Sequence, residues 1–103
     1  MTGLTGEELN ALEHAGHAPM PAQVERWAAV NSGTTNLAGL RSVAGLLADA
    51  FSGLPGDVAL IAPDPVESVD AKGTVTKVQR GDHLRVSVRP DAPARVLLTG
   101  HMD

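Results

Sequence analysis

The chain of 103 residues contains no cysteine and almost no aromatic side chains. Without cysteine it can form no disulfide, no thiolate nucleophile and no zinc site with cysteine ligands. Its two aromatic residues, Trp27 and Phe51, cannot build the stacking platforms that bind single-stranded nucleic acid. Basic residues are also scarce, because 8 Lys and Arg stand against 12 Asp and Glu and leave a net charge of −4. Since this charge argues against a phosphate-binding surface, we expect no nucleic-acid partner.

Long apolar runs are missing as well. None approaches the roughly 20 residues that a membrane span requires. The first ten residues lack the basic and apolar regions of a signal peptide. We therefore expect no membrane partner and a cytoplasmic protein. Because 43% of the residues are hydrophobic and 19% are charged, we expect a folded chain of one small domain or part of one.

Helix signals fill the first half of the chain. Thr5 and Glu8 have the spacing of a capping box, and Asn36 can cap a later helix. That later helix carries an apolar stripe at spacings of three and four residues, formed by Leu37, Leu40, Ala44, Leu47 and Phe51. In the first helix we expect Leu9 and Leu12 to form the inner face.

Strand signals fill the second half. Residues 83–89 alternate between apolar and polar side chains, as in a half-buried strand. Residues 95–99 are nearly continuously apolar, as in an interior strand, and a turn at 90–93 would join these two strands in a hairpin. We expect residues 64–73 to form a loop or a short edge strand. In full, the patterns predict helices over about 6–15, 21–30 and 37–52, and strands over about 57–62, 74–79, 83–89 and 95–100.

This order predicts an α/β fold, with N-terminal helices followed by the first strands of a mixed sheet. His101 and Asp103 stand at the carboxyl end of the last predicted strand. Residues two apart on extended backbone point the same way, and a carboxylate can orient a metal-ligating imidazole. The alternative is an ordinary strand end with two solvated polar residues.

Other candidate groups have simpler interpretations. His14 and His17 could meet on one helix face, but cations near a helix C-terminus are also favourable without any metal. Ser32 and Thr34 have no identifiable base nearby in the sequence, so they carry little support for nucleophilic catalysis.

Two segments resemble a family of co-catalytic zinc hydrolases. Residues 96–103, VLLTGHMD, are similar to the family's apolar strand followed by Gly-His-x-Asp. Residues 27–36, WAAVNSGTTN, resemble its short helix, Asn-Ser-Gly and polar loop, and residues 37–51 resemble its long amphipathic helix. The family includes glutamate carboxypeptidase, acetylornithine deacetylase and succinyl-diaminopimelate desuccinylase. The resemblance covers residues 20–103, about four fifths of the chain.

The resemblance implies a zinc-dependent hydrolase, a peptidase or deacylase, that cleaves amide or peptide bonds of N-acyl amino acids or of C-terminal residues. By resemblance His101 is a metal ligand and Asp103 is the catalytic-site carboxylate that orients it. The family binds two zinc ions, with cobalt or manganese as alternatives, which activate a water and stabilise the oxyanion while a Glu takes the proton. The family's bridging Asp, its Glu pair, a further carboxylate and a second His have no counterpart here.

These observations lead to two hypotheses about what the chain is. In the first, residues 1–103 are the N-terminal part of a single zinc-peptidase-like catalytic domain, with the remainder and a lid domain absent. That piece would be inactive, its zinc site would be incomplete, and its exposed apolar surface would make it self-associate. The substrate of the complete protein would be a small N-acyl amino acid or a peptide. In the second, the chain is a small non-enzymatic α/β binding or interaction module, complete at 103 residues.

Overall fold

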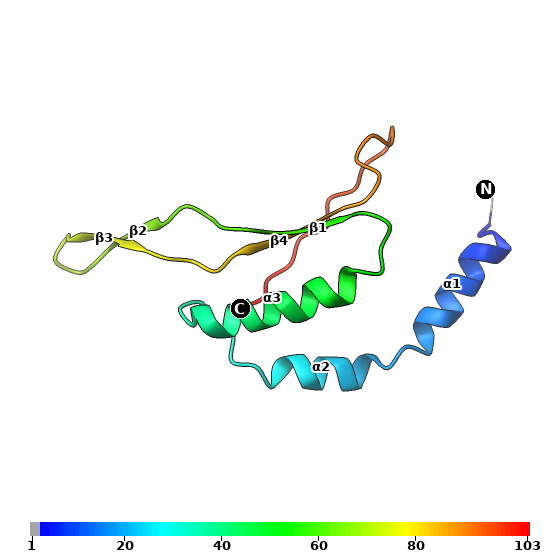
Figure 1. Cartoon of the computed structure of the whole chain (residues 1–103), viewed down its shortest axis with the longest axis horizontal. Coiled ribbons are helices and arrows are strands. Elements are labelled where there is room, and N and C mark those ends of the chain that lie inside the picture. Colours follow the sequence, from blue (N-terminus) through cyan, green and yellow to red (C-terminus); the bar gives the residue numbers. More distant parts are fainter. Residues whose placement is uncertain (1–2) are drawn as a thin grey trace.

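A computed structural model describes residues 3–103, which form helices in the first half and short antiparallel strands in the second (Figure 1). The fold is therefore mixed α and β, as the sequence patterns predict at this coarse level. The described helices are α1 (Gly6–Gly16), α2 (Met20–Ala28) and α3 (Leu37–Phe51).

The start of α1 is fixed by the predicted capping box. The Glu8 amide donates to the Thr5 hydroxyl at 3.1 Å, and the Thr5 amide donates to the Glu8 carboxylate at 2.7 Å. The prediction that Leu9 and Leu12 form the inner face of this helix is wrong, because their side chains are 54% and 60% exposed. Figure 1 shows the reason: α1 extends away from the other helices and strands, so no other described element offers it a surface on which to bury a face.

The buried core lies on the inner face of α3. Asn36 caps this helix, since its side-chain oxygen accepts a hydrogen bond from the Gly39 amide at 3.0 Å. Of the predicted stripe and its flanks, Leu40, Val43 and Ala44 are buried at 2–7% exposure. The two ends of the stripe, Leu37 and Phe51, remain 37–41% exposed. Packing against the strands therefore covers only the middle of α3.

The strands form one long interrupted hairpin. β1 (Asp57–Ile61) pairs antiparallel with β4 (His83–Ser87), and β2 (Val66–Val69) pairs antiparallel with β3 (Val75–Val78). β2 falls within the segment for which a loop or short edge strand was predicted. Only the β1–β4 ladder lies over α3, with Val58 opposite Val86 and Leu60 opposite Leu84 (Figure 1).

The predicted strand at residues 95–100 and its hairpin with 83–89 are wrong. β4 pairs with β1 instead, and the chain turns at 89–92, where the Ala92 amide donates to the Arg89 carbonyl at 3.1 Å. Residues 95–103 then run without regular secondary structure toward the N-terminal end of α3 (Figure 1). The apolar side chains of this segment are 85–88% exposed, namely Val96, Leu97 and Leu98. The described strands offer this segment no ladder, and an apolar run forms a buried strand only with such a partner.

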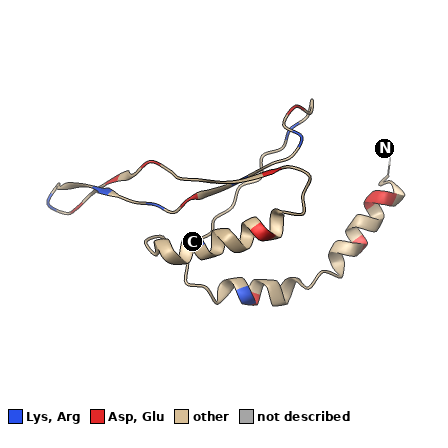
Figure 2. Ribbon diagram, in the orientation of Figure 1, with Lys and Arg blue, Asp and Glu red and all other residues tan. Residues whose placement is uncertain are grey.

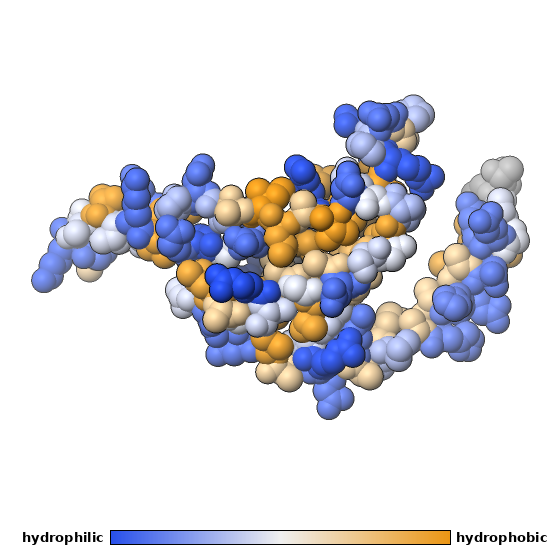
Figure 3. All heavy atoms as spheres, in the orientation of Figure 1, coloured by the Kyte–Doolittle hydropathy of each residue, from blue (hydrophilic) through white to orange (hydrophobic). Residues whose placement is uncertain are grey.

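The described chain is extended. Its radius of gyration is 18.3 Å, against about 13 Å expected for a compact domain of this length. Apolar atoms gather over the central part beside β1 and β4, while hydrophilic atoms dominate α1 and the tip of the hairpin (Figure 3). Charges of both signs are scattered along the ribbon without a basic cluster (Figure 2). Among the residues described, no helix has the length and apolar character to span a membrane.

Candidate functional site

The predicted pair, His101 and Asp103, is brought into contact. His101 Nδ1 lies 3.2 Å from Asp103 Oδ1, and the two side chains are 91% and 32% exposed. When Nδ1 carries the proton, it donates to the carboxylate and leaves Nε2 with a free lone pair. This is the arrangement in which an imidazole can ligate a metal ion through Nε2.

Two hydroxyl groups from the loop before α3 hold the same segment. Ser32 Oγ donates to the Met102 carbonyl oxygen at 2.7 Å, and Thr34 Oγ1 donates to Asp103 Oδ2 at 2.6 Å. Both oxygens of the Asp103 carboxylate therefore have a partner. From the sequence, Ser32 and Thr34 are weighed only as nucleophiles and these contacts are missed, and no local signal could have found them, because the partners lie 69–70 residues apart.

The loop that presents these hydroxyls is built by asparagine side chains. Asn31 Oδ1 accepts from the Gly33 amide at 3.1 Å, and Asn36 Nδ2 donates to the Asn31 carbonyl oxygen at 2.9 Å. A Cβ atom placed on Gly39 would overlap that same carbonyl oxygen. Gly39 therefore allows the loop to lie directly on the first turn of α3, which fixes where Ser32 and Thr34 point.

The hydrogen bonds of Asp103 favour its charged form. The Thr34 hydroxyl, followed by the His101 imidazole, lowers the pKa of the Asp103 carboxyl below its ordinary value. The carboxylate is thus ionised at neutral pH and serves as an acceptor for both partners.

The pair borders an open depression of about 390 Å³. Its other walls come from Leu40, from Thr34 and from the junction between β3 and β4, which contributes Arg80, Gly81, Asp82 and His83. The fold thus places His83, the first residue of β4, at the same hollow as His101. Within residues 3–103, however, no three His, Asp or Glu side chains come close enough to hold a metal ion together. The depression supplies one oriented imidazole rather than a complete metal site.

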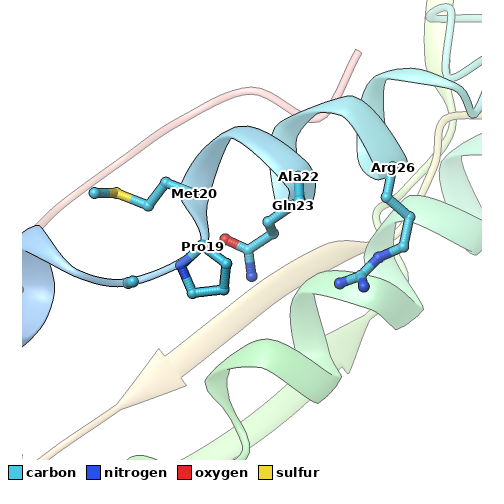
Figure 4. Close-up of a pocket in the computed structure, with 6 residues that line it drawn as sticks. Pro19, Met20, Ala22, Gln23 and Arg26 are labelled. Atoms are coloured by element: carbon cyan, nitrogen blue, oxygen red, sulfur yellow. The ribbon is translucent and has the colours of Figure 1, made fainter.

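A smaller hollow of about 180 Å³ lies along α2 (Figure 4). Its lining consists of Ala18, Pro19, Met20, Ala22, Gln23 and Arg26. Because these residues include no carboxylate and no imidazole, this hollow has neither a metal ligand nor a general base, and it contains none of the predicted site residues.

Comparisons of the chain with protein-family models, with curated proteins and with solved structures found no match.

Proposed function

We propose that this chain contributes a metal-ligating histidine to a zinc-dependent hydrolase that cleaves amide or peptide bonds of N-acyl amino acids or of C-terminal residues. In this proposal His101 is the ligand and Asp103 is the carboxylate that orients it. The chain corresponds to the N-terminal part of a zinc-peptidase-like catalytic domain and is inactive by itself.

The observation that supports this proposal is the contact between His101 Nδ1 and Asp103 Oδ1. It leaves Nε2 facing away from the carboxylate on a side chain that is almost fully exposed. An imidazole held in this way has the free lone pair and the fixed ring orientation that a zinc ligand needs. The resemblance of residues 96–103 to the Gly-His-x-Asp signature adds the reaction class.

The residues present could supply one zinc ligand, His101, together with the carboxylate that orients it, Asp103. Protein zinc sites use roughly three or four protein ligands, so a working centre needs ligands beyond His101. When bound, zinc would polarise the scissile carbonyl and lower the pKa of a water molecule. The chain's own contribution is to orient, through the contact of His101 with Asp103, an imidazole that lines the depression beside Leu40 and His83.

The test is made on the complete protein encoded by the gene. Its zinc content and its hydrolysis of N-acyl amino acids and glutamate-terminated peptides are compared with those of His101→Ala, Asp103→Asn and His14→Ala. We expect His101→Ala to abolish hydrolysis and Asp103→Asn to lower activity or zinc affinity about 10–100-fold. His14, an exposed residue in the last turn of α1, is the matched control and should change neither. A wild-type protein without zinc and without hydrolysis refutes the proposal.

A second candidate is the non-enzymatic interaction module. The observation that favours it is the exposure of three consecutive apolar side chains, Val96, Leu97 and Leu98. Exposed apolar segments of this kind mark association surfaces. This candidate predicts specific association without zinc uptake by the complete protein, so the same zinc measurement separates the two functions.

A further inference from the structure

We propose that Ser32 and Thr34 are positioning residues whose hydroxyl groups hold His101 in the tautomer with a proton on Nδ1 and a free Nε2. The inference rests on the proposed function only for the identity of the ligand, zinc. The hydroxyl contacts and the state of the imidazole stand on the geometry alone.

The two oxygens of the Asp103 carboxylate have different hydrogen-bond partners. Thr34 Oγ1 donates to Oδ2 at 2.6 Å, while His101 Nδ1 lies 3.2 Å from Oδ1. An anchored Oδ2 restricts rotation of the carboxylate, so Oδ1 stays on the side of the imidazole. Hydrogen bonds to an ionised acceptor are the stronger kind, and the short Thr34 contact belongs to that class.

The backbone between His101 and Asp103 is anchored as well. Ser32 Oγ donates to the Met102 carbonyl oxygen at 2.7 Å. Met102 lies directly between His101 and Asp103 in the chain, so this bond fixes the peptide that connects the imidazole with the carboxylate. One hydroxyl therefore sets the position of the backbone, and the other sets the direction of the carboxylate.

Ser32 and Thr34 supply the hydrogen bonds that hold residues 95–103 against the rest of the described chain. In the described part of the chain, no hydrogen bond other than those of Ser32 and Thr34 joins residues 95–103 to the rest of the protein. These residues form no strand, so they gain no ladder bonds either. The loop before α3 is thus the hydrogen-bonding element that sets the geometry of the pair.

The loop is suited to this role because it is itself held at both ends. Asn31 and Asn36 bond to each other and to neighbouring amides, and Gly39 lets the loop lie on α3. A hydroxyl on a restrained loop loses less conformational freedom when it forms its bond than one on a free chain.

The test reads the tautomer of His101 directly. The 103-residue chain is labelled with ¹⁵N-histidine, and two-bond ¹H–¹⁵N correlation spectra are recorded at about pH 8, where a surface imidazole is neutral. Wild type and Thr34→Ser, which keeps the hydroxyl, should show mainly the form with the proton on Nδ1. In Thr34→Val and in Ser32→Ala the ratio of the Nδ1–H to the Nε2–H form should fall by about threefold or more, the change expected from one lost hydrogen bond.

Thr35→Val is the matched control, because Thr35 is an exposed neighbour in the same loop whose hydroxyl forms no hydrogen bond in the described structure. Its spectrum should match that of wild type. An unchanged tautomer ratio in both Thr34→Val and Ser32→Ala, or an equal change in Thr35→Val, overturns the proposal. Unaltered circular dichroism in each variant excludes loss of the fold as the cause.

The zinc measurement on the complete protein keeps this proposal separate from the proposed function. If the tautomer responds to Thr34→Val but the protein takes up no zinc, the positioning role stands and the hydrolase assignment fails. If zinc binds while the tautomer ratio is insensitive to both hydroxyls, the positioning role fails and the hydrolase assignment stands.

Discussion

Substituting Gly39 by alanine should destabilise the protein, although alanine is the better helix former. Gly39 is in the first turn of α3, where its amide is bonded to the Asn36 cap. A Cβ atom there would overlap the carbonyl oxygen of Asn31 and lie 3.0 Å from Asn36 Nδ2. The loop backbone would have to move, because a carbonyl oxygen, unlike the end of a flexible side chain, cannot rotate away.

The magnitude follows from opposing terms. Replacing glycine by alanine in a helix contributes at most about 1 kcal/mol of stability. Overpacking against a rigid neighbour costs about 1–3 kcal/mol, and loss of the Asn36 cap costs about 1 kcal/mol more. We expect a net loss of about 1–3 kcal/mol for Gly39→Ala, obtained by combining these terms. Each kcal/mol would lower Tm by about 4–8 °C in a domain of this size.

Gly45→Ala supplies the matched control in the same helix. Gly45 is exposed, and a Cβ atom there would meet nothing within 4 Å. This variant should gain up to about 1 kcal/mol. Urea unfolding followed by helical circular dichroism gives both free energies of unfolding. If the Gly39 variant proves as stable as the Gly45 variant, the close approach of the loop to α3 is refuted.

Three further predictions concern other parts of the chain. Leu40→Ala should lower the free energy of unfolding by about 2–5 kcal/mol, because Leu40 is buried under the β3–β4 junction. As its control, Leu54→Ala at a 45% exposed position should stay within about 0.5 kcal/mol of wild type in the same urea assay. The wild-type chain should self-associate in sedimentation velocity experiments, because the apolar side chain of Leu97 is 86% exposed. Leu97→Asp should shift the chain toward monomer. A monomeric wild type at high concentration would contradict this prediction. Thr5→Ala should weaken α1 by about 1 kcal/mol without changing the unfolding of the core, because no residue of α1 is buried. Cα chemical shifts along α1 measure the fraying of this helix. A shifted unfolding transition of the core would contradict the prediction.

Features set by neighbouring residues could be predicted from the sequence. The capping box of Thr5 and Glu8 and the cap by Asn36 depend on atoms three residues apart, and both are confirmed. The bounds of α3 follow from its periodic apolar stripe for the same reason. Within the site, the contact of His101 with Asp103 is also local, since the residues are two apart.

Features that need a distant partner could not be predicted. An apolar run such as residues 96–98 indicates burial, but the run does not show which strand would cover it, and the described strands leave it exposed. The hydroxyls of Ser32 and Thr34 bond to residues at the other end of the chain, and the sequence gives no sign of that pairing. The same holds for the exposure of Leu9, because an amphipathic helix buries its face only where the fold supplies a surface.

The long hairpin is broken into two separate ladders, β1 with β4 and β2 with β3, and we expect each ladder to open as its own unit. Pro63 and Pro65 have no amide proton to donate where the two ladders separate, and Gly81 lies against Leu40 on the other side of that gap. The outer unit, β2 with β3, is a two-stranded ribbon without helix cover, and such ribbons are marginally stable in water. Its backbone amides should therefore exchange with deuterium far sooner than those of β1 and β4, which α3 covers. We expect unzipping that begins at the tip to stop at the Gly81–Leu40 contact, so that the outer ribbon opens and closes while the depression beside His101 keeps its shape.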